Sequence, residues 1–404
     1  MSRWKKLLLI FGVLLLASQV PFAYRRYKLG QLNAAIQQVN SQRTDLPQDL
    51  LVEYQGVVHV HSFLGGHSKG GFREIISAAQ ANKLDFVVMT EHALSEFDTS
   101  LMTLKGLHGG VLFINGNEVN TGSGRLLIIP GDGLEIIGSM NVLEQIQGQP
   151  ERKLVKVVAY PQEFKEWWQP DAYEAVEVYN VYTNARQINP VVMFFDGLWS
   201  YRSYPHLLFA NFYQRPSANL KLWDQAIAGT GKKLVGLAGN DAHANIGFEL
   251  TDSSGKRLLG LNLDPYERSF RLVRMHIVTP LIHDSVATPE RVMAAITAGN
   301  CFIGFDIFGD TTGFRYAARD GNESKLMGDE ITLEDEVRLN ATLPMAGRIV
   351  LLKDGAMIQE TANTRTMEYV AKERGSYRVE AYLPQLGKPV GDQPWIISNP
   401  IYVR

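Results

Sequence analysis

The sequence predicts an α/β protein whose strands and helices alternate around a parallel, closed sheet. Apolar runs of strand length recur along the first three fifths of the chain, at 57–60, 86–89, 111–114 and 234–237. Between the first two runs, the apolar residues of 72–79 recur with helical spacing. Alternation of strand and helix favours a parallel sheet, which in a barrel closes on itself.

The N-terminus predicts a membrane anchor. Residues 7–24 form an apolar run near the lower length limit for a helix that spans a membrane. A cleaved signal peptide is the alternative, but no clear A-x-A cleavage site follows the run, and basic residues come at once. We therefore expect a signal anchor over 1–28, a tether or short helix over 29–50, and a single-pass membrane protein whose main body is extracytoplasmic (periplasmic).

Composition and charge limit the kinds of partner that the protein is expected to bind. The 404 residues suffice for more than one domain, and the net charge of −2 gives no reason to expect a nucleic-acid partner. Cys301 is the only cysteine, so an intrachain disulfide is excluded. The expected partners are a small-molecule substrate and, through the anchor, a membrane.

The C-terminal part changes character from about residue 312, where the helical pattern stops. Short alternating strands follow at 337–343, 348–352 and 377–382, and Asp354-Gly355 predicts a tight hairpin turn. We expect a small antiparallel β-sandwich of immunoglobulin-like type over 312–404.

The apolar runs of the first part end in residues that bind transition metals. The first run ends in His59-Val60-His61, and residues i and i+2 of a strand project from one face. The same residue types follow the later runs, and one more histidine lies in a Gly-rich loop. Because C-terminal strand ends of a barrel converge, these residues are expected to form one pocket. The candidate metal ligands are His59, His61, His67, His92, Glu118, Asp241 and His243.

In order and spacing these motifs resemble those of the polymerase and histidinol phosphatase (PHP) superfamily of metal-dependent hydrolases, from about residue 53 to about residue 308. The matching motifs are H-x-H, a histidine in a Gly-rich loop, a T-D-H-like triplet, G-x-E and a late D-x-H. The resemblance implies a distorted (β/α)7 TIM-like barrel, here over 51–311, that holds two or three metal ions. The tail 395–403 is similar to that of the branch containing carbaryl-type amide and ester hydrolases.

The resemblance also implies how the ligands are shared. One metal ion would be held by His59, His61, Glu118 and Asp241. Another would be held by His67, His92 and His243. Glu118 would bridge to a further ion. This imidazole-rich set with carboxylates suits divalent zinc, manganese or iron.

Two positions depart from the family pattern. Arg125 and Tyr160 stand where histidines are usual, so we expect about one or two ions per chain. Arg125 either offers positive charge to a phosphate or another anion, or is a surface residue of a Gly-Ser loop. Tyr160 is either a catalytic acid or a packed aromatic, and Asn180 either lines the pocket or caps a turn. Arg125, Tyr160 and Asn180 are the candidate catalytic residues.

The expected function is metal-dependent hydrolysis of a phosphoester by metal-activated water. Amide, carbamate or ester hydrolysis of the carbaryl-hydrolase type is the alternative. A non-catalytic binding protein with a partly degenerate metal site is the second alternative. The remaining histidines match no motif and are expected to be structural, namely His108, His206, His276 and His283.

Overall fold

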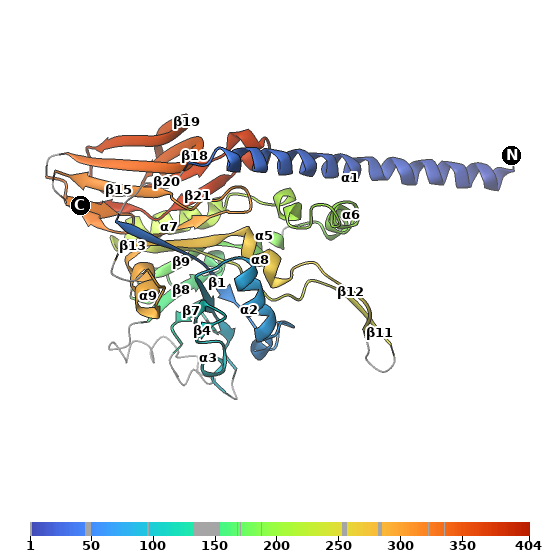
Figure 1. Cartoon of the computed structure of the whole chain (residues 1–404), viewed down its shortest axis with the longest axis horizontal. Helices are drawn as coiled ribbons and strands as arrows, with labels where there is room; N and C mark the ends of the chain where they lie inside the picture. The colour runs from blue at the N-terminus through green and yellow to red at the C-terminus, as the bar shows by residue number, and fades with distance from the viewer. Residues whose placement is uncertain are drawn as a thin grey trace.

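One long helix runs along the edge of a mixed α/β body and projects beyond it toward the N-terminus (Figure 1). The computed structural model describes residues 2–44, 50–94, 97–131, 154–167, 169, 171–186, 188–252, 257–281, 285–321, 323–334 and 336–404. His283 lies outside these residues.

The long helix, α1 (Arg3–Ser41), is the anchor candidate. Within the described residues it is the one helix long and apolar enough to cross a membrane. The helix does not end at the basic residues after the apolar run. It continues through 29–41, where Leu29, Leu32 and Val39 are buried. These residues recur with helical spacing and give the helix an apolar stripe, so this segment is part of the folded body rather than a free tether.

Two large sheets and one two-stranded hairpin make up the described part of the 51–311 region. The first holds β1 (Leu51–Val60) between a parallel and an antiparallel neighbour. Its other strands in this region are β2 (Phe86–Met89), β4 (Gly106–His108), β5 (Val111–Ile114), β13 (Arg274–Pro280) and β14 (Cys301–Gly304). The second sheet contains, in spatial order, β10 (Val235–Gly239), β9 (Ala175–Asn180), β8 (Val155–Ala159), β7 (Arg125–Ile129), β6 (Asn117–Asn120) and β3 (Glu91–His92).

The two sheets meet where β1 ends. The amide of Asn240 donates to the carbonyl of Val58 at 2.9 Å, and the amide of His61 donates to the carbonyl of Ala242 at 3.1 Å. The expected TIM-like barrel is not confirmed, because the strands divide between two sheets and β7 is antiparallel to both neighbours. The division occurs where the extended segment is interrupted, once between β2 and β3 and again between β5 and β6.

Helices cover these sheets and connect their strands. Helix α2 (Phe72–Ala81) confirms the helical pattern of 72–79 and packs on α8 (Tyr266–Leu272). A hairpin of β11 (Gly247–Thr251) and β12 (Arg257–Asn262) extends from the body on the side from which α1 projects (Figure 1). The remaining α-helices are α3 (Thr99–Met102), α5 (Val181–Ala185), α6 (Pro190–Ser200), α7 (Ser217–Thr230) and α9 (Pro289–Ala298).

The C-terminal strands are antiparallel except for one short pair. The Asp354-Gly355 hairpin is confirmed, since both residues have positive φ, 50° and 83°, as a type I′ turn requires. The strands expected at 337–343 and 348–352 are one strand with a register shift. The strands are β15 (Arg315–Asp320), β16 (Glu323–Leu326), β17 (Glu330–Ile331), β18 (Val337–Lys353), β19 (Ala356–Ala371), β20 (Gly375–Tyr382), β21 (Pro394–Ser398) and β22 (Ile401–Val403).

This part is joined to the rest of the chain through its sheet. Strand β21 pairs with β14, so the C-terminal strands continue the first sheet. The immunoglobulin-like sandwich stays a prediction. The C-terminal strands extend the sheet that contains β1.

Candidate metal centre

His59 and His61 project into the body from the end of β1, but not by simple strand alternation. His59 has φ of 66°, in the left-handed region, and the pairing of β1 with β2 shifts register between Val57 and Val60. The two rings lie with centroids 5.0 Å apart. A β-bulge of this kind re-aims a side chain, so the H-x-H pair converges because the strand is distorted.

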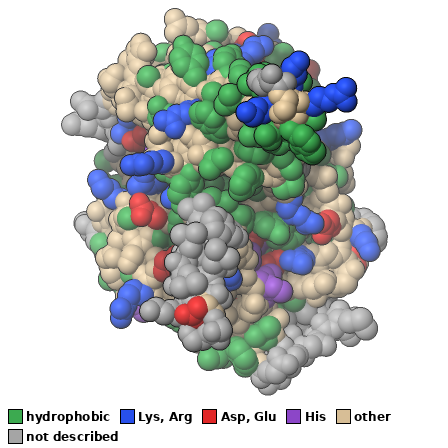
Figure 2. Space-filling model, turned by 90° about the vertical axis from the view of Figure 1, so that its right-hand side faces the viewer, with side chains coloured by type: hydrophobic (Ala, Val, Ile, Leu, Met, Phe, Trp, Pro, Cys, Tyr) green, Lys and Arg blue, Asp and Glu red, His purple; other side chains and the backbone are tan. Residues whose placement is uncertain are grey.

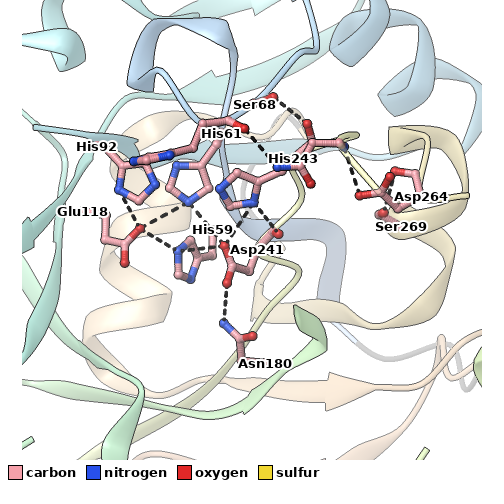
Figure 3. Close-up of polar contacts among 12 residues, drawn as sticks. His59, His61, Ser68, His92, Glu118, Asn180, Asp241, His243, Asp264 and Ser269 are labelled. Atoms are coloured by element: carbon pink, nitrogen blue, oxygen red, sulfur yellow. Dashed lines mark hydrogen bonds and ion pairs between the residues drawn. The ribbon is translucent and has the colours of Figure 1, made fainter. Parts of the chain in front are cut away.

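Four other predicted ligands join this pair. His92 lies on β3, Glu118 on β6, and Asp241 and His243 directly follow β10 (Figure 3). The ring of His61 packs against two others, with centroids 4.5 Å from His92 and 4.3 Å from His243, and those two lie 5.9 Å apart. Strand ends distant in sequence thus bring six candidate ligands into one cluster.

His67 lies at the rim of the cluster. Its side chain is exposed, and its ring packs edge-on against that of His92 with centroids 4.9 Å apart. The donor groups that lie within 4.8 Å of one another are His59, His61 and Asp241, and His61, His92 and His243. His61 takes the place beside His92 and His243 that the resemblance implies for His67.

The spacing of the donor atoms suits metal ions. Glu118 Oε2 lies 3.4 Å from both His59 Nε2 and His61 Nε2, and 3.1 Å from His92 Nδ1. Asp241 Oδ1 lies 3.5, 3.4 and 3.4 Å from nitrogens of His59, His61 and His243. Ligand atoms arranged tetrahedrally at zinc–nitrogen distances are about 3.4 Å apart.

Unpaired buried atoms point the same way. Neither ring nitrogen of His61 has a hydrogen-bond partner, and Asp241 Oδ1 has none. Burial of such atoms without partners is costly. A cation shared between them would satisfy both, so the residues present fit a divalent transition metal.

The protonation states of most of these groups suit metal binding. Burial lowers the pKa of His61 to about 3 and that of His92 to about 4. For His59 the carboxylates of Glu177 and Asp241 outweigh burial and raise the pKa, so a bound metal ion would displace the proton of His59. Burial alone would raise the pKa of Glu118 and of Asp241, but His59 and its neighbours outweigh it and hold both pKa values below the ordinary range. Neutral imidazoles and ionised carboxylates are the forms that bind metal.

The second oxygens of the two carboxylates are already occupied by the residues that replace the family histidines. Arg125 Nη1 donates to Glu118 Oε1 at 2.9 Å, and the Tyr160 hydroxyl donates to Asp241 Oδ2 at 2.7 Å. Burial and the carboxylate of Asp241 raise the pKa of Tyr160, so it keeps its proton. Arg125 is therefore not a free surface arginine, and Tyr160 is not merely a packed aromatic.

Asn180 has a positioning role. Its amide donates to Glu177 Oε2 at 3.0 Å and to Asp241 Oδ2 at 3.3 Å, and its oxygen accepts from the amide of Thr183 at the start of α5. The side chain is buried and is absent from the lining of the adjoining cavity. The structure shows the capping contact of Asn180 and does not place it in the lining of that cavity, and its amide orients two carboxylates.

Sequence reasoning missed Glu177. Its Oε1 lies 2.6 Å from His59 Nδ1, and both side chains are buried. A carboxylate on the far nitrogen of a metal-ligating histidine fixes its orientation and raises its basicity. The close approach requires Gly239, because a Cβ there would lie 1.6 Å from Glu177 Oε1. The available signal was a carboxylate in the middle of the apolar strand β9.

Backbone strain is concentrated at this site. Among the described residues, seven other than glycine have positive φ. Four of them belong to the cluster or adjoin it, namely His59, Tyr160, Asp241 and Ala244. Such conformations cost about 1–3 kcal/mol each and gather at functional sites.

A cavity of about 320 Å³ opens onto the cluster. Its lining includes two guanidinium groups, Arg125 and Arg186, and one further carboxylate, Glu163. Within the described residues Arg186 has no carboxylate partner, and it lies over the ring of Tyr182. The other lining residues are His67, His92, Tyr160, Asp241, His243 and Asn245.

The comparison with solved structures shows a distant likeness. No family model matches the chain, and no curated protein matches it. A solved two-domain protein from Bacteroides vulgatus, described as containing a predicted PHP-like metal-dependent phosphoesterase, is similar at 13% sequence identity and a TM-score of 0.38. The match covers 89% of this chain and 97% of that chain. A likeness so distant carries no argument about activity, which rests on the site itself.

Proposed function

We propose that the protein is a metal-dependent hydrolase of phosphoesters. One observation carries the proposal: an open cavity has metal-ligand donors on its floor and guanidinium groups in its wall. The donor set fits divalent metal, and arginine forks match the oxygens of a phosphate.

The residues around the site have different roles in the proposed reaction. Bound transition-metal ions supply Lewis acidity and lower the pKa of water. Arg125 is partly exposed to the cavity while one of its nitrogens holds Glu118, so its remaining N–H groups are available to a substrate oxygen. Arg186 offers a second guanidinium from α5. Glu177 and Asn180 keep His59 and Asp241 in place.

The arginines favour a phosphoester over the alternatives. A neutral amide, carbamate or carboxylic ester would leave Arg186 without a counter-charge, whereas a phosphate oxygen would pair with it. Arg125 and Tyr160 occupy the oxygens to which a third ion would bind, which supports one or two ions per chain. The carbaryl-hydrolase type and the non-catalytic binding protein become outcomes of the test.

The test is a substrate panel on the full chain in detergent or nanodiscs. The protein is stripped of metal, reloaded with zinc, manganese or iron, and assayed against phosphomonoesters, phosphodiesters, carboxylic esters, amides and carbamates. Phosphoester turnover should require metal and should be absent in His61→Leu but present in His108→Leu, a matched change outside the cluster. Turnover of carbonyl substrates alone, or of no substrate, would overturn the proposal.

We infer further that α1 stays attached and that everything after Arg25 is extracytoplasmic. The contacts of α1 with α6 support an anchor that stays attached. A short basic N-terminal tail favours an orientation in which this tail remains in the cytoplasm. A reporter fused after Arg404 tests it. Activity of an exported phosphatase reporter is expected, whereas cytoplasmic fluorescence, or a new N-terminus near Ala23, would contradict it.

A further inference from the structure

Helix α6 exposes an unusual apolar face. Val191, Phe194 and Leu198 are 61%, 63% and 69% exposed. They recur at i, i+3 and i+7, so they lie on one side of the helix. Large apolar side chains gathered in this way mark a surface that contacts an apolar partner.

The anchor helix fixes where α6 lies. The rings of Phe22 and Phe195 pack at a tilt with centroids 4.9 Å apart. Arg25 donates two hydrogen bonds to Asp196, from Nε to Oδ1 at 2.7 Å and from Nη2 to Oδ2 at 2.6 Å. The contacts continue on either side, through Gln19 with Trp199 and Arg26 with Trp199. Helix α6 is thus held beside residues 19–26 of α1, where the apolar run gives way to basic residues.

That level of a spanning helix is the membrane–water interface. A helix with an apolar face held there lies in the membrane surface, with that face toward the acyl chains. Figure 2 looks at the side from which α1 projects. It shows hydrophobic side chains gathered on this side of the molecule, where both α1 and α6 lie, with Lys and Arg side chains around them and a histidine in a hollow. Basic residues around an apolar patch suit anionic headgroups.

A second, apolar cavity lies between α1, α6 and the body. Its volume is about 120 Å³, close to that of an engineered apolar cavity of about 150 Å³ that holds benzene. The polar groups in its wall are engaged with other groups of the protein: Arg25 pairs with Asp196, Asp264 accepts from the amides of Asn245 and Ile246, and Arg268 lies over the ring of Tyr201. Its apolar lining includes Val181, Ile188, Met193, Phe209, Leu263 and Leu272.

The short helix α5 separates the two cavities. Val181 and Ala185 line the apolar cavity, while Tyr182 and Arg186 line the cavity of the metal centre. A ligand beside Arg186 would therefore have to pass around α5 to reach the apolar cavity, for which the neighbouring residues Asn245, in the wall of one cavity, and Ile246, in the wall of the other, mark the place.

We propose that the substrate is an anionic amphiphile taken from the membrane. Its phosphate group lies beside the metal centre, an alkyl segment lies in the apolar cavity, and α6 holds both cavities against the bilayer. This inference rests on the proposed function and names the substrate class of the same site.

The test is binding, which needs no turnover. Metal-loaded full chain in nanodiscs is titrated with alkylphosphonates from methyl to hexyl. Each methylene that enters the cavity should tighten binding by up to about fourfold, so Kd should fall at least about tenfold along the series. Gly197→Leu fills the cavity from α6, since a Cβ there meets nothing within 4 Å, and should reduce the gain to about threefold or less. Gly229→Leu, the same change on the exposed side of α7, should keep it.

The outcomes separate this inference from the function it rests on. Binding of every phosphonate with equal Kd, or an unchanged series in Gly197→Leu, overturns the amphiphile and leaves the phosphoesterase standing. Binding of none contradicts both.

The position of α6 has its own readout. A fluorophore on Phe194→Cys should be quenched by spin-labelled lipids, whereas one on Leu107→Cys, equally exposed on β4, should not. Cys301 is buried and does not interfere. Equal quenching at both positions would overturn the membrane contact.

Discussion

Two buried histidine clusters in this protein differ in what completes them. His276 and His61 are both fully buried. His276 Nδ1 lies 2.8 Å from Glu53, and its Nε2 lies 3.0 Å from Asp306. His61 has no hydrogen-bond partner on either nitrogen. The first cluster carries its positive charge as an imidazolium between two carboxylates, whereas in the second Glu118 Oε2 and Asp241 Oδ1 face a His61 ring that burial keeps neutral.

Their pKa values follow from this difference. Burial lowers the pKa of a histidine, and for His61 it prevails, giving about 3. For His276 the carboxylates of Asp306 and Glu53 outweigh burial and raise the pKa to about 9. Burial of a histidine therefore does not by itself indicate a metal site. Unpaired ring nitrogens facing carboxylates do.

Activity should separate the clusters most. His61→Leu should lower metal-dependent turnover on the order of 10³-fold, because several kcal/mol of charge stabilisation is lost with the ion. His276→Leu, assayed at a temperature where it is folded, should stay within about tenfold of wild type. Steady-state kinetics on the metal-reloaded proteins decides this, and equal losses would erase the distinction.

Stability of the metal-free protein should show the reverse order. Removing His276 leaves Glu53 with Arg315 and Asp306 with Arg274 as remaining cationic partners, and should cost about 3 kcal/mol, the lower end of the range for a broken buried ion pair. His61→Leu removes two unpaired nitrogens and should change the free energy of unfolding by less than about 1 kcal/mol. Urea unfolding with chelator present measures both. A large loss in His61→Leu would mean that its nitrogens are satisfied without metal.

The His276 cluster should also make stability depend on pH. Its pKa is higher in the folded than in the unfolded chain, so its contribution is complete below about pH 6.5 and is lost as pH rises through about 9. The shift corresponds to about 3 kcal/mol over that window. Metal-free wild type should lose stability there, and His276→Leu should lose about 3 kcal/mol less, since His59, whose pKa is also raised, contributes to both proteins. A flat wild-type profile would contradict the imidazolium.

Glu177→Gln should have the smallest of these effects. Loss of the carboxylate on His59 Nδ1 should weaken metal binding about 10–100-fold while leaving the ligands in place. A competition titration against a metal-binding dye measures the change. Unchanged affinity would restrict Glu177 to a packing role.

The sequence predicts the ligand types well because they follow apolar strands in a fixed order. The alternation of residues along a strand does not reveal that the backbone of His59 is in the left-handed region, because a β-bulge depends on the neighbouring strand. Glu177 escapes because its strand has an ordinary buried pattern. The extension of α1 through 29–41 was open to prediction, since Leu29, Leu32, Ile36 and Val39 recur with helical spacing.

The division into two sheets was not predictable from the chain alone. It depends on where β2 and β5 break and on β7 running antiparallel to β6 and β8, which are tertiary features. The position of α6 was not predictable from the sequence either. Its apolar residues predict a buried helix, but the structure places α6 beside α1 with part of its apolar face exposed.

Elemental analysis of the full chain tests the central claim most directly. The protein is expressed with zinc, manganese and iron supplied, purified in detergent, and compared with His61→Leu and with His108→Leu. We expect about one or two equivalents of transition metal in wild type and His108→Leu, and a clear loss in His61→Leu. Three fully occupied ions would show that Arg125 and Tyr160 do not block the third site. Less than about half an equivalent in wild type would contradict the metal centre itself.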